Sequence, residues 1–457
     1  MKKRSLFVAA YLAMGAAVMF TSCSNDDDVI NGGNGNGNEP EQVLTLQVSN
    51  TDNTVKTRGR DLYSSEAKQT IDKVKVVIYQ EEQNGDLTVH AIKDFDKWNT
   101  DAVSSIYETN GHGREAAWAL KGEEKLQEGE TYKVVALGYS DGDYSTSINN
   151  FTSLTTTSGT LSLPLTPAIE ATGIEADEIF AGALSELKVG DQGTLMIGQT
   201  NVQPVVTLHR QVAGTFGYFK NIPAKDATGK YKATKLRLVA ANVNTKLVLD
   251  QFNSSFTETG ANVNYVVNGL TSSTATKVNF NNGDEGYEVY SIDLLQWFTS
   301  GDENQDGFYG QGDTWVNVIT DAKAKFEEGS VFAGKFLIPS KFVDTTSTFE
   351  LQLIGEAIDG GDEVVIKHWN IKNTEQKDKK AIVVSGTDNF TWNEAATADS
   401  ETSYSIVRNH LYTLGHKGSD DSTTDPDPDE PEDLSKNQDL VIKVNDNWEA
   451  IHEMEID

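Results

Sequence analysis

Apolar and polar residues alternate along much of this chain, which is the pattern of a β-strand with one buried face. Near the start, Leu44, Leu46 and Val48 alternate with polar neighbours. Further strands are predicted over residues 74–78, 134–139, 205–219, 235–241, 332–338, 349–354 and 364–371. Dipeptides that favour turns, such as Asn-Gly and Asp-Gly, separate these segments. The pattern therefore predicts many short strands joined by tight turns.

Helical periodicity is weak except over residues 292–298, so the predicted fold is all-β. The length of the chain and a break near Arg210 predict two β-sandwich domains in tandem, residues 42–209 and 210–417. Domains of this size bury a full core without disulfide bonds.

The first 22 residues have the composition of a secretory signal. A basic head at residues 2–4 precedes an apolar run that ends just before Cys23, and this run is too short for a stable membrane span. The alternative is an uncleaved anchor or a buried helix. Cys23 is the single cysteine of the chain and stands where bacterial lipoproteins are lipidated, which excludes internal disulfides and a cysteine-based zinc site. We expect residues 1–22 to be removed and residues 23–41, rich in Asn and Gly, to form a flexible lipid tether.

The formal net charge of the chain is −31 at pH 7. A field of that sign repels phosphate backbones, which argues against nucleic acid as a partner. The same charge favours the solubility of a repeating surface assembly.

The end of the chain carries a linker and one more predicted strand. Residues 418–436 are rich in Asp and Pro, a composition that favours an extended linker. Residues 437–457 follow as an amphipathic strand with an apolar face. That face is formed mainly by Leu440, Ile442, Val444, Trp448, Met454 and Ile456. We expect this strand to have no sheet of its own, and an unpaired strand edge must dock elsewhere.

The terminal strand resembles the first predicted strand. Leu440, Ile442 and Val444 match Leu44, Leu46 and Val48 in type and spacing. Chance similarity between two short strands is common, and it stays open as an explanation.

A basic cluster with Arg58 and Arg60 follows the first strand, in a polar connection where proteolysis is favoured. A cut there would free the first strand and leave a groove. The alternative is a solvated turn with a few positive charges.

Several motifs together resemble the fimbrillins, the shaft subunits of the type V pili of Bacteroidales. The resemblance covers essentially the whole chain and includes the Cys23 site and the aspartates that follow it at residues 26–28. Its remaining motifs are residues 57–59, 177–182, 208–213, 334–339 and 407–412, followed by the Pro/Asp linker and the terminal strand. None of these motifs is a catalytic signature.

The resemblance implies two transthyretin-like sandwich domains and assembly by donor-strand exchange. An arginine-specific surface protease would cut after Arg58, or after Arg60, and remove residues 42–58 as part of a propeptide. The terminal strand of an identical subunit would then fill the groove by β-augmentation. The implied product is a cell-surface fimbria, exported through the periplasm as an outer-membrane lipoprotein precursor. Its further partners would be accessory tip and anchor subunits and a host or bacterial surface ligand.

One acidic loop matches a calcium-loop pattern. Asp302, Asn304, Asp306 and Asp313 supply closely spaced oxygens around a glycine, which suits a hard cation. Against calcium, the last position is Asp in place of a bidentate Glu, and no clear helix follows. An acidic surface loop is the alternative, and no cofactor is required.

No phosphate loop or zinc-protease motif occurs, and we do not expect an enzyme. Two alternatives to a shaft subunit stay open. One is a tip or anchor subunit of the same kind of fimbria. The other is a surface glycan-binding lipoprotein, for which Trp297, Trp315 and Trp369 are candidate platform residues.

Overall fold

The structure is a computed structural model in which β-strands dominate the described residues. The described residues are 42–48, 70–104, 113–140, 148, 162–164, 178–190, 193–199, 204–241, 244, 246–248, 269–270, 277–319, 325–339, 349–373, 381–384, 390–393, 406, 408, 411–418, 428–436 and 440–445. The helical segments among them are short: α1 (Trp98–Asp101), η1 (Gly122–Glu124) and α4 (Leu294–Trp297). The prediction of an all-β fold is confirmed.

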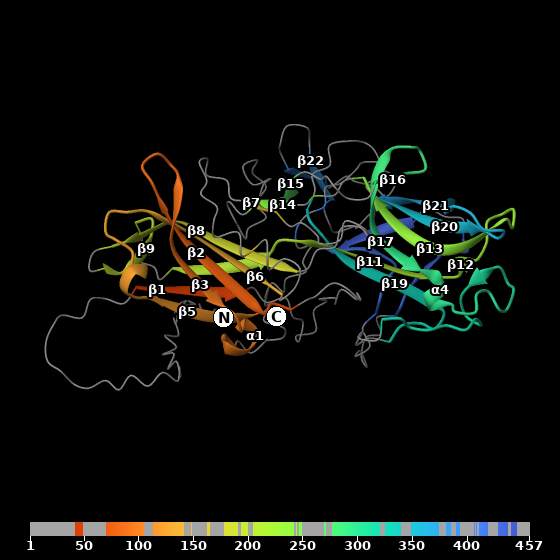
Figure 1. Cartoon of the computed structure of the whole chain (residues 1–457), viewed down its shortest axis with the longest axis horizontal. Coiled ribbons are helices and arrows are strands. Elements are labelled where there is room, and N and C mark those ends of the chain that lie inside the picture. The colour runs from red at the N-terminus through yellow and green to blue at the C-terminus, as the bar shows by residue number, and fades with distance from the viewer. Residues whose placement is uncertain are drawn as a thin grey trace, which may run out of the picture. The chain divides into compact units, whose positions relative to one another are not determined.

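The first large sheet has nine strands (Figure 1). Eight of them follow one another across the sheet as β3 (Leu87–Phe95), β2 (Lys73–Glu81), β6 (Tyr132–Tyr139), β8 (Ile179–Val189), β10 (Val205–Arg210), β1 (Gln42–Val48), β5 (Arg114–Leu120) and β4 (Val103–Ser104). The ninth, β9 (Leu195–Ile197), pairs with β8. The first described strand, β1, therefore lies inside the sheet, third from the β4 edge.

The second large sheet has ten strands, coloured green to blue in Figure 1. Nine follow one another as β16 (Lys277–Asn279), β17 (Glu285–Asp293), β13 (Tyr231–Ala240), β20 (Phe349–Ala357), β21 (Val364–Asn373), β26 (Leu440–Asn445), β24 (Leu411–Leu414), β11 (Ala213–Lys220) and β19 (Ser330–Leu337). The tenth, β25 (Glu432–Asp433), pairs with β11. The predicted run over 205–219 is thus two strands, because β10 joins the first sheet and β11 the second.

Three small sheets complete the strand pairing of the described residues. They pair β12 (Ile222–Pro223) with β18 (Phe308–Tyr309), β14 (Lys246–Val248) with β7 (Ser162–Pro164) and β15 (Gly269–Leu270), and β22 (Ala381–Val384) with β23 (Phe390–Asn393). The proposed division into two sandwich domains at residues 209 and 210 falls where β10 ends, and it stays a prediction.

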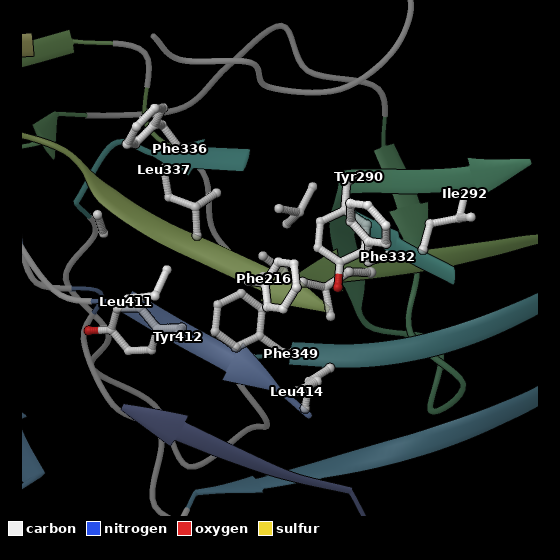
Figure 2. Packing of buried hydrophobic residues seen from close by; sticks show 14 of the residues in the cluster. Phe216, Tyr290, Ile292, Phe332, Phe336, Leu337, Phe349, Leu411, Tyr412 and Leu414 are labelled. Atoms are coloured by element: carbon white, nitrogen blue, oxygen red, sulfur yellow. The ribbon is translucent and has the colours of Figure 1, made fainter. Parts of the chain in front are cut away.

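Large apolar side chains from the strands of the second sheet pack together in a buried core. Figure 2 shows Phe216, Phe349, Tyr412 and Leu414 close together, contributed by β11, β20 and β24. Each of these side chains is buried. Strands far apart in the sequence therefore share one core, whose stability comes from apolar burial.

Candidate functional site

β1 has both of its edges paired inside the first sheet. It runs parallel to β10, with Leu46 opposite Val206, and antiparallel to β5, with Leu44 opposite Trp118. Leu44, Leu46 and Val48 are fully buried. We call the space between β5 and β10 the β1 slot. Without β1, this slot would have one edge that accepts a parallel strand, one that accepts an antiparallel strand, and an apolar floor.

A polar contact closes one end of the β1 slot. The Gln42 side chain is only 5% exposed. Its Nε2 donates to the carbonyl oxygen of Leu126 at 3.1 Å, and its Oε1 accepts from the amide nitrogen of Leu126 at 2.8 Å. One side-chain amide thus satisfies both backbone groups of one buried residue. Sequence reasoning missed this contact because a glutamine at the start of a strand reads as an exposed residue.

β26 also lies inside a sheet with both edges paired. It runs parallel to β21, with Leu440 opposite Ile371, and antiparallel to β24, with Val444 opposite Tyr412. Leu440 and Ile442 are each 1% exposed. The expectation that the terminal strand has no sheet within its own chain is therefore wrong. The alternation of residues revealed the strand, but the partners lie far away in the sequence and could not be read from it.

The second half of the predicted linker is held against the second sheet. Asp429 Oδ1 lies 2.8 Å from Lys417 Nζ and accepts a 2.8 Å hydrogen bond from the Gly418 amide. The Tyr218 hydroxyl donates to Asp429 Oδ2 at 3.2 Å. Burial raises the pKa of Tyr218, and the Asp429 carboxylate acts in the same direction. The hydroxyl therefore stays protonated and able to donate.

Backbone contacts continue this attachment. His416 and Glu430 exchange two backbone hydrogen bonds, and Leu434, fully buried, donates its amide to the Lys220 carbonyl. Gly415 has φ +77°, and a Cβ there would lie 2.5 Å from the Tyr218 carbonyl oxygen. Residues 428–436 of the predicted linker are thus held in place, because their polar groups and one leucine contact β11 and its neighbours. The linker itself stays a prediction.

Three motifs of the fimbrillin resemblance meet at one buried point. Glu178 Oε1 accepts from Arg210 Nη2 at 2.6 Å, with side chains that are 0% and 2% exposed. Arg408 Nη1 donates to the Arg210 carbonyl oxygen at 3.1 Å. The Arg210 guanidinium also lies 5.5 Å from the centre of the Phe180 ring. A buried, hydrogen-bonded ion pair of this kind orients the end of β10, where the chain passes from one large sheet to the other.

The acidic loop uses its oxygens to accept backbone hydrogen bonds. Asp313 accepts from the amides of Glu303 and Gly310 at 2.8 and 3.0 Å, and Asp306 Oδ1 accepts from Phe308. Across the described part of the chain, no three or more His, Cys, Asp or Glu side chains gather so that they could hold a metal ion. The possible calcium site at Asp302, Asn304, Asp306 and Asp313 stays a prediction, with the acidic surface loop as its alternative.

The three candidate platform tryptophans are part of the core. Trp297 and Trp369 are 2% and 3% exposed. Trp315 is half-buried and donates its Nε1 hydrogen to the Ser330 carbonyl at 2.6 Å. A stacking platform for a sugar needs exposed ring faces, so these residues do not form one.

The remaining predicted site residues lie outside the described residues. These are Cys23, Arg58, Arg60, Trp448, Met454 and Ile456. The backbone of Val444 is described, but its side chain is not. None of the helices in the described part of the chain is long and apolar enough to cross a membrane.

No protein-family model and no curated protein matches the chain. Solved structures that resemble it include a proposed cell adhesion protein from Bacteroides eggerthii, at 12% identity over 89% of this chain and 97% of the other, with a TM-score of 0.37. The tip fimbrial protein Mfa3 from Porphyromonas gingivalis matches at 12% identity over 89% and 99%, with a TM-score of 0.34. The fimbrial anchor protein Mfa2 from the same organism matches at 11% over 89% and 98%, with a TM-score of 0.31. Similarity of this size does not by itself assign a fold or a function.

Proposed function

We propose that this chain is a structural shaft subunit of a cell-surface fimbria and not an enzyme. It is exported as a lipoprotein precursor, trimmed after Arg58 or Arg60, and polymerised by donor-strand exchange into a fibre that supports adhesion. Its partners are identical subunits, accessory tip and anchor subunits, an arginine-specific surface protease and a surface ligand. The proposal joins the fimbrillin resemblance to the geometry of β1 and β26.

One observation carries the proposal: β1 and β26 occupy the same kind of position. Each is an inner strand with one parallel and one antiparallel neighbour. Each buries the same face, with Leu44 and Leu46 in one and Leu440 and Ile442 in the other. A strand with these neighbours fits the β1 slot without reversing its direction.

Exchange between the two positions is close to balanced in energy. Burying Leu440 and Ile442 contributes roughly 1.5–3 kcal/mol each, and this is already gained within the chain. Moving β26 to another copy exchanges that burial for similar burial. The net drive comes from covering the slot that trimming has opened, since an uncovered apolar groove with two unpaired strand edges is unfavourable.

Trimming of the full-length chain tests the proposal. Treatment with an arginine-specific protease should give a product that begins at Gly59 or Asp61 and forms ladders that resist mild heating in detergent. A double Arg58→Ala, Arg60→Ala variant is the matched control and should remain monomeric. Polymers in which residues 42–48 are still present in every subunit would contradict the proposal.

The position of β26 favours a tip subunit as the second candidate function. A terminal subunit accepts a strand but has none to donate, and a tail that stays paired with β21 and β24 is unavailable to a neighbour. The shaft role requires β26 to leave this position.

A reversible disulfide between β24 and β26 separates the two candidates. Thr413 and Lys443 are directly opposed in the antiparallel pair, so cysteines at both positions can lock β26 to its own chain. Cys23 would be absent after trimming and would not interfere. In a shaft subunit, the oxidised variant should stay monomeric and the reduced variant should polymerise. If neither the oxidised nor the reduced variant polymerises, the tip role is favoured. If both polymerise, β26 is not the donor and the shaft proposal fails.

A further inference from the structure

The match between the two strands extends two residues beyond the apolar residues, toward the N-terminus. Residues 42–48 read Gln-Val-Leu-Thr-Leu-Gln-Val, and residues 438–444 read Gln-Asp-Leu-Val-Ile-Lys-Val. When Leu440 replaces Leu44, Gln438 replaces Gln42. Both glutamines stand two residues before the first leucine in the sequence. In a strand, residues two apart share a face, so a tail strand that begins at Gln438 would carry its amide on the face of Leu440.

This position of the β1 slot requires a side chain with both a donor and an acceptor. The backbone N–H and C=O of Leu126 are both bonded to the Gln42 amide, and Leu126 itself is 4% exposed. Removing Gln42 leaves two buried backbone groups without these bonds, which is strongly unfavourable. An apolar replacement satisfies neither group, and a carboxylate satisfies only the N–H.

A residue pair on the opposite face of the strand also fits this register. Gln47 is exposed and lies directly opposite Glu115 of β5. With Leu440 in place of Leu44, Lys443 takes the position of Gln47. An ammonium then faces the Glu115 carboxylate across an antiparallel pair, which is a favourable cross-strand arrangement.

We infer that the Gln42–Leu126 contact is a recognition site of the β1 slot, and that its incoming ligand is Gln438 of a second copy of this chain, with Lys443 of that copy opposite Glu115. This inference rests on the proposed strand exchange and fixes its register. Residues 438–444 are the occupant because they carry the amide, the apolar face and the basic residue at the spacing that the slot requires.

A graft within the full-length, untrimmed chain tests the fit without any polymerisation. Four substitutions, Val43→Asp, Thr45→Val, Leu46→Ile and Gln47→Lys, turn residues 42–48 into the tail sequence. The grafted chain should unfold within a few degrees of the native chain, since Gln42 and the apolar face are kept. Adding Gln42→Leu to the graft should lower Tm by roughly 5–10 °C, because both Leu126 groups lose their partner. A graft that does not fold, or one that Gln42→Leu leaves unchanged, would overturn the inference.

Polymerisation of the trimmed chain provides the second arm. Gln438→Leu should slow ladder formation or speed disassembly about 10- to 100-fold, while Asp439→Ala, one residue along, should have less than about a threefold effect. Lys443→Glu should weaken assembly, and adding Glu115→Lys should restore it across the interface between copies. Native-like assembly of Gln438→Leu would overturn the register. If the unmodified trimmed chain forms no polymer, strand exchange itself fails, and the graft result still decides whether the tail sequence fits the slot.

Discussion

Folding buries Lys335, and burial disfavours its charged form. It belongs to β19 and is 7% exposed, and burial lowers its pKa to about 7. In the unfolded chain the same group has a pKa of about 10.4. Between these values the unfolded chain binds more protons than the folded chain, so stability rises as the pH rises from about 7 to about 10.

Replacing this ammonium with an apolar group should therefore be more favourable where the lysine is charged. We expect the effect of Lys335→Met on the free energy of unfolding to be more stabilising at pH 6 than at pH 9, by roughly 2–3 kcal/mol. Urea unfolding at the two pH values measures the difference. Lys225→Met, at an exposed position, is the control and should change neither value. A gain independent of pH would show that the charge of Lys335 is not the cause.

Individual apolar residues of β1 and β26 could be predicted, but the polar contacts of these strands could not. Alternation alone placed Leu44, Leu46, Leu440 and Ile442 on apolar strand faces, and all four side chains are buried in the structure. Gln42 was missed because its partner is the backbone of Leu126, 84 residues away. A contact of that kind leaves no local pattern, since any residue type can supply a backbone N–H and C=O.

At the scale of elements, β1 is a full member of the first sheet before trimming. Leu46→Ala in the untrimmed chain should lower the free energy of unfolding by about 2–5 kcal/mol, because it leaves a cavity in a closed core. Gln47→Ala, on the exposed face, should stay within about 0.5 kcal/mol. Urea denaturation of the three untrimmed proteins gives both values.

The same pair of variants behaves differently after trimming. Because residues 42–48 leave with the propeptide in the proposed mechanism, assembled Leu46→Ala polymers should resist heat and detergent as well as unmodified polymers. Polymers that are weakened by Leu46→Ala would mean that β1 stays in the fibre.

The predicted strands were found mostly where the hydrophobic alternation is regular, as in β2, β6, β20 and β21. The sequence predicts strand structure over 205–219 and a domain break near Arg210. In the structure β10 ends at Arg210 and β11 begins at Ala213, and the two strands belong to different sheets. What could not be predicted is which sheet receives β26. β26 pairs with β21 at Ile371 and with β24 at Tyr412. These partners are distant in the sequence, so the local sequence of the strand does not specify them.

At the scale of the whole molecule, a donor that starts inside its own chain has to be released. Asp429 is one polar attachment of the segment that leads to β26, through Lys417, Gly418 and Tyr218. The Lys417 side chain is 3% exposed and that of Asp429 is 24% exposed. Hydrogen bonds to charged groups in such settings contribute roughly 1.5–3 kcal/mol each, so this attachment opposes release.

Weakening that attachment should make assembly faster. We expect Asp429→Ala, after trimming, to form ladders on the order of tenfold faster than the unmodified chain, since about 1.4 kcal/mol corresponds to a factor of ten. Ser435→Ala is the matched control, because in the described part of the chain the Ser435 hydroxyl donates to Asp433 of the same segment. Time courses of ladder formation at equal protein concentration give the rates. The untrimmed Asp429→Ala chain should stay monomeric, because its β1 slot is still filled. Slower assembly of the trimmed variant would show that residues 428–436 must stay docked for donation, and that the tail extends from a fixed base instead of leaving with its linker.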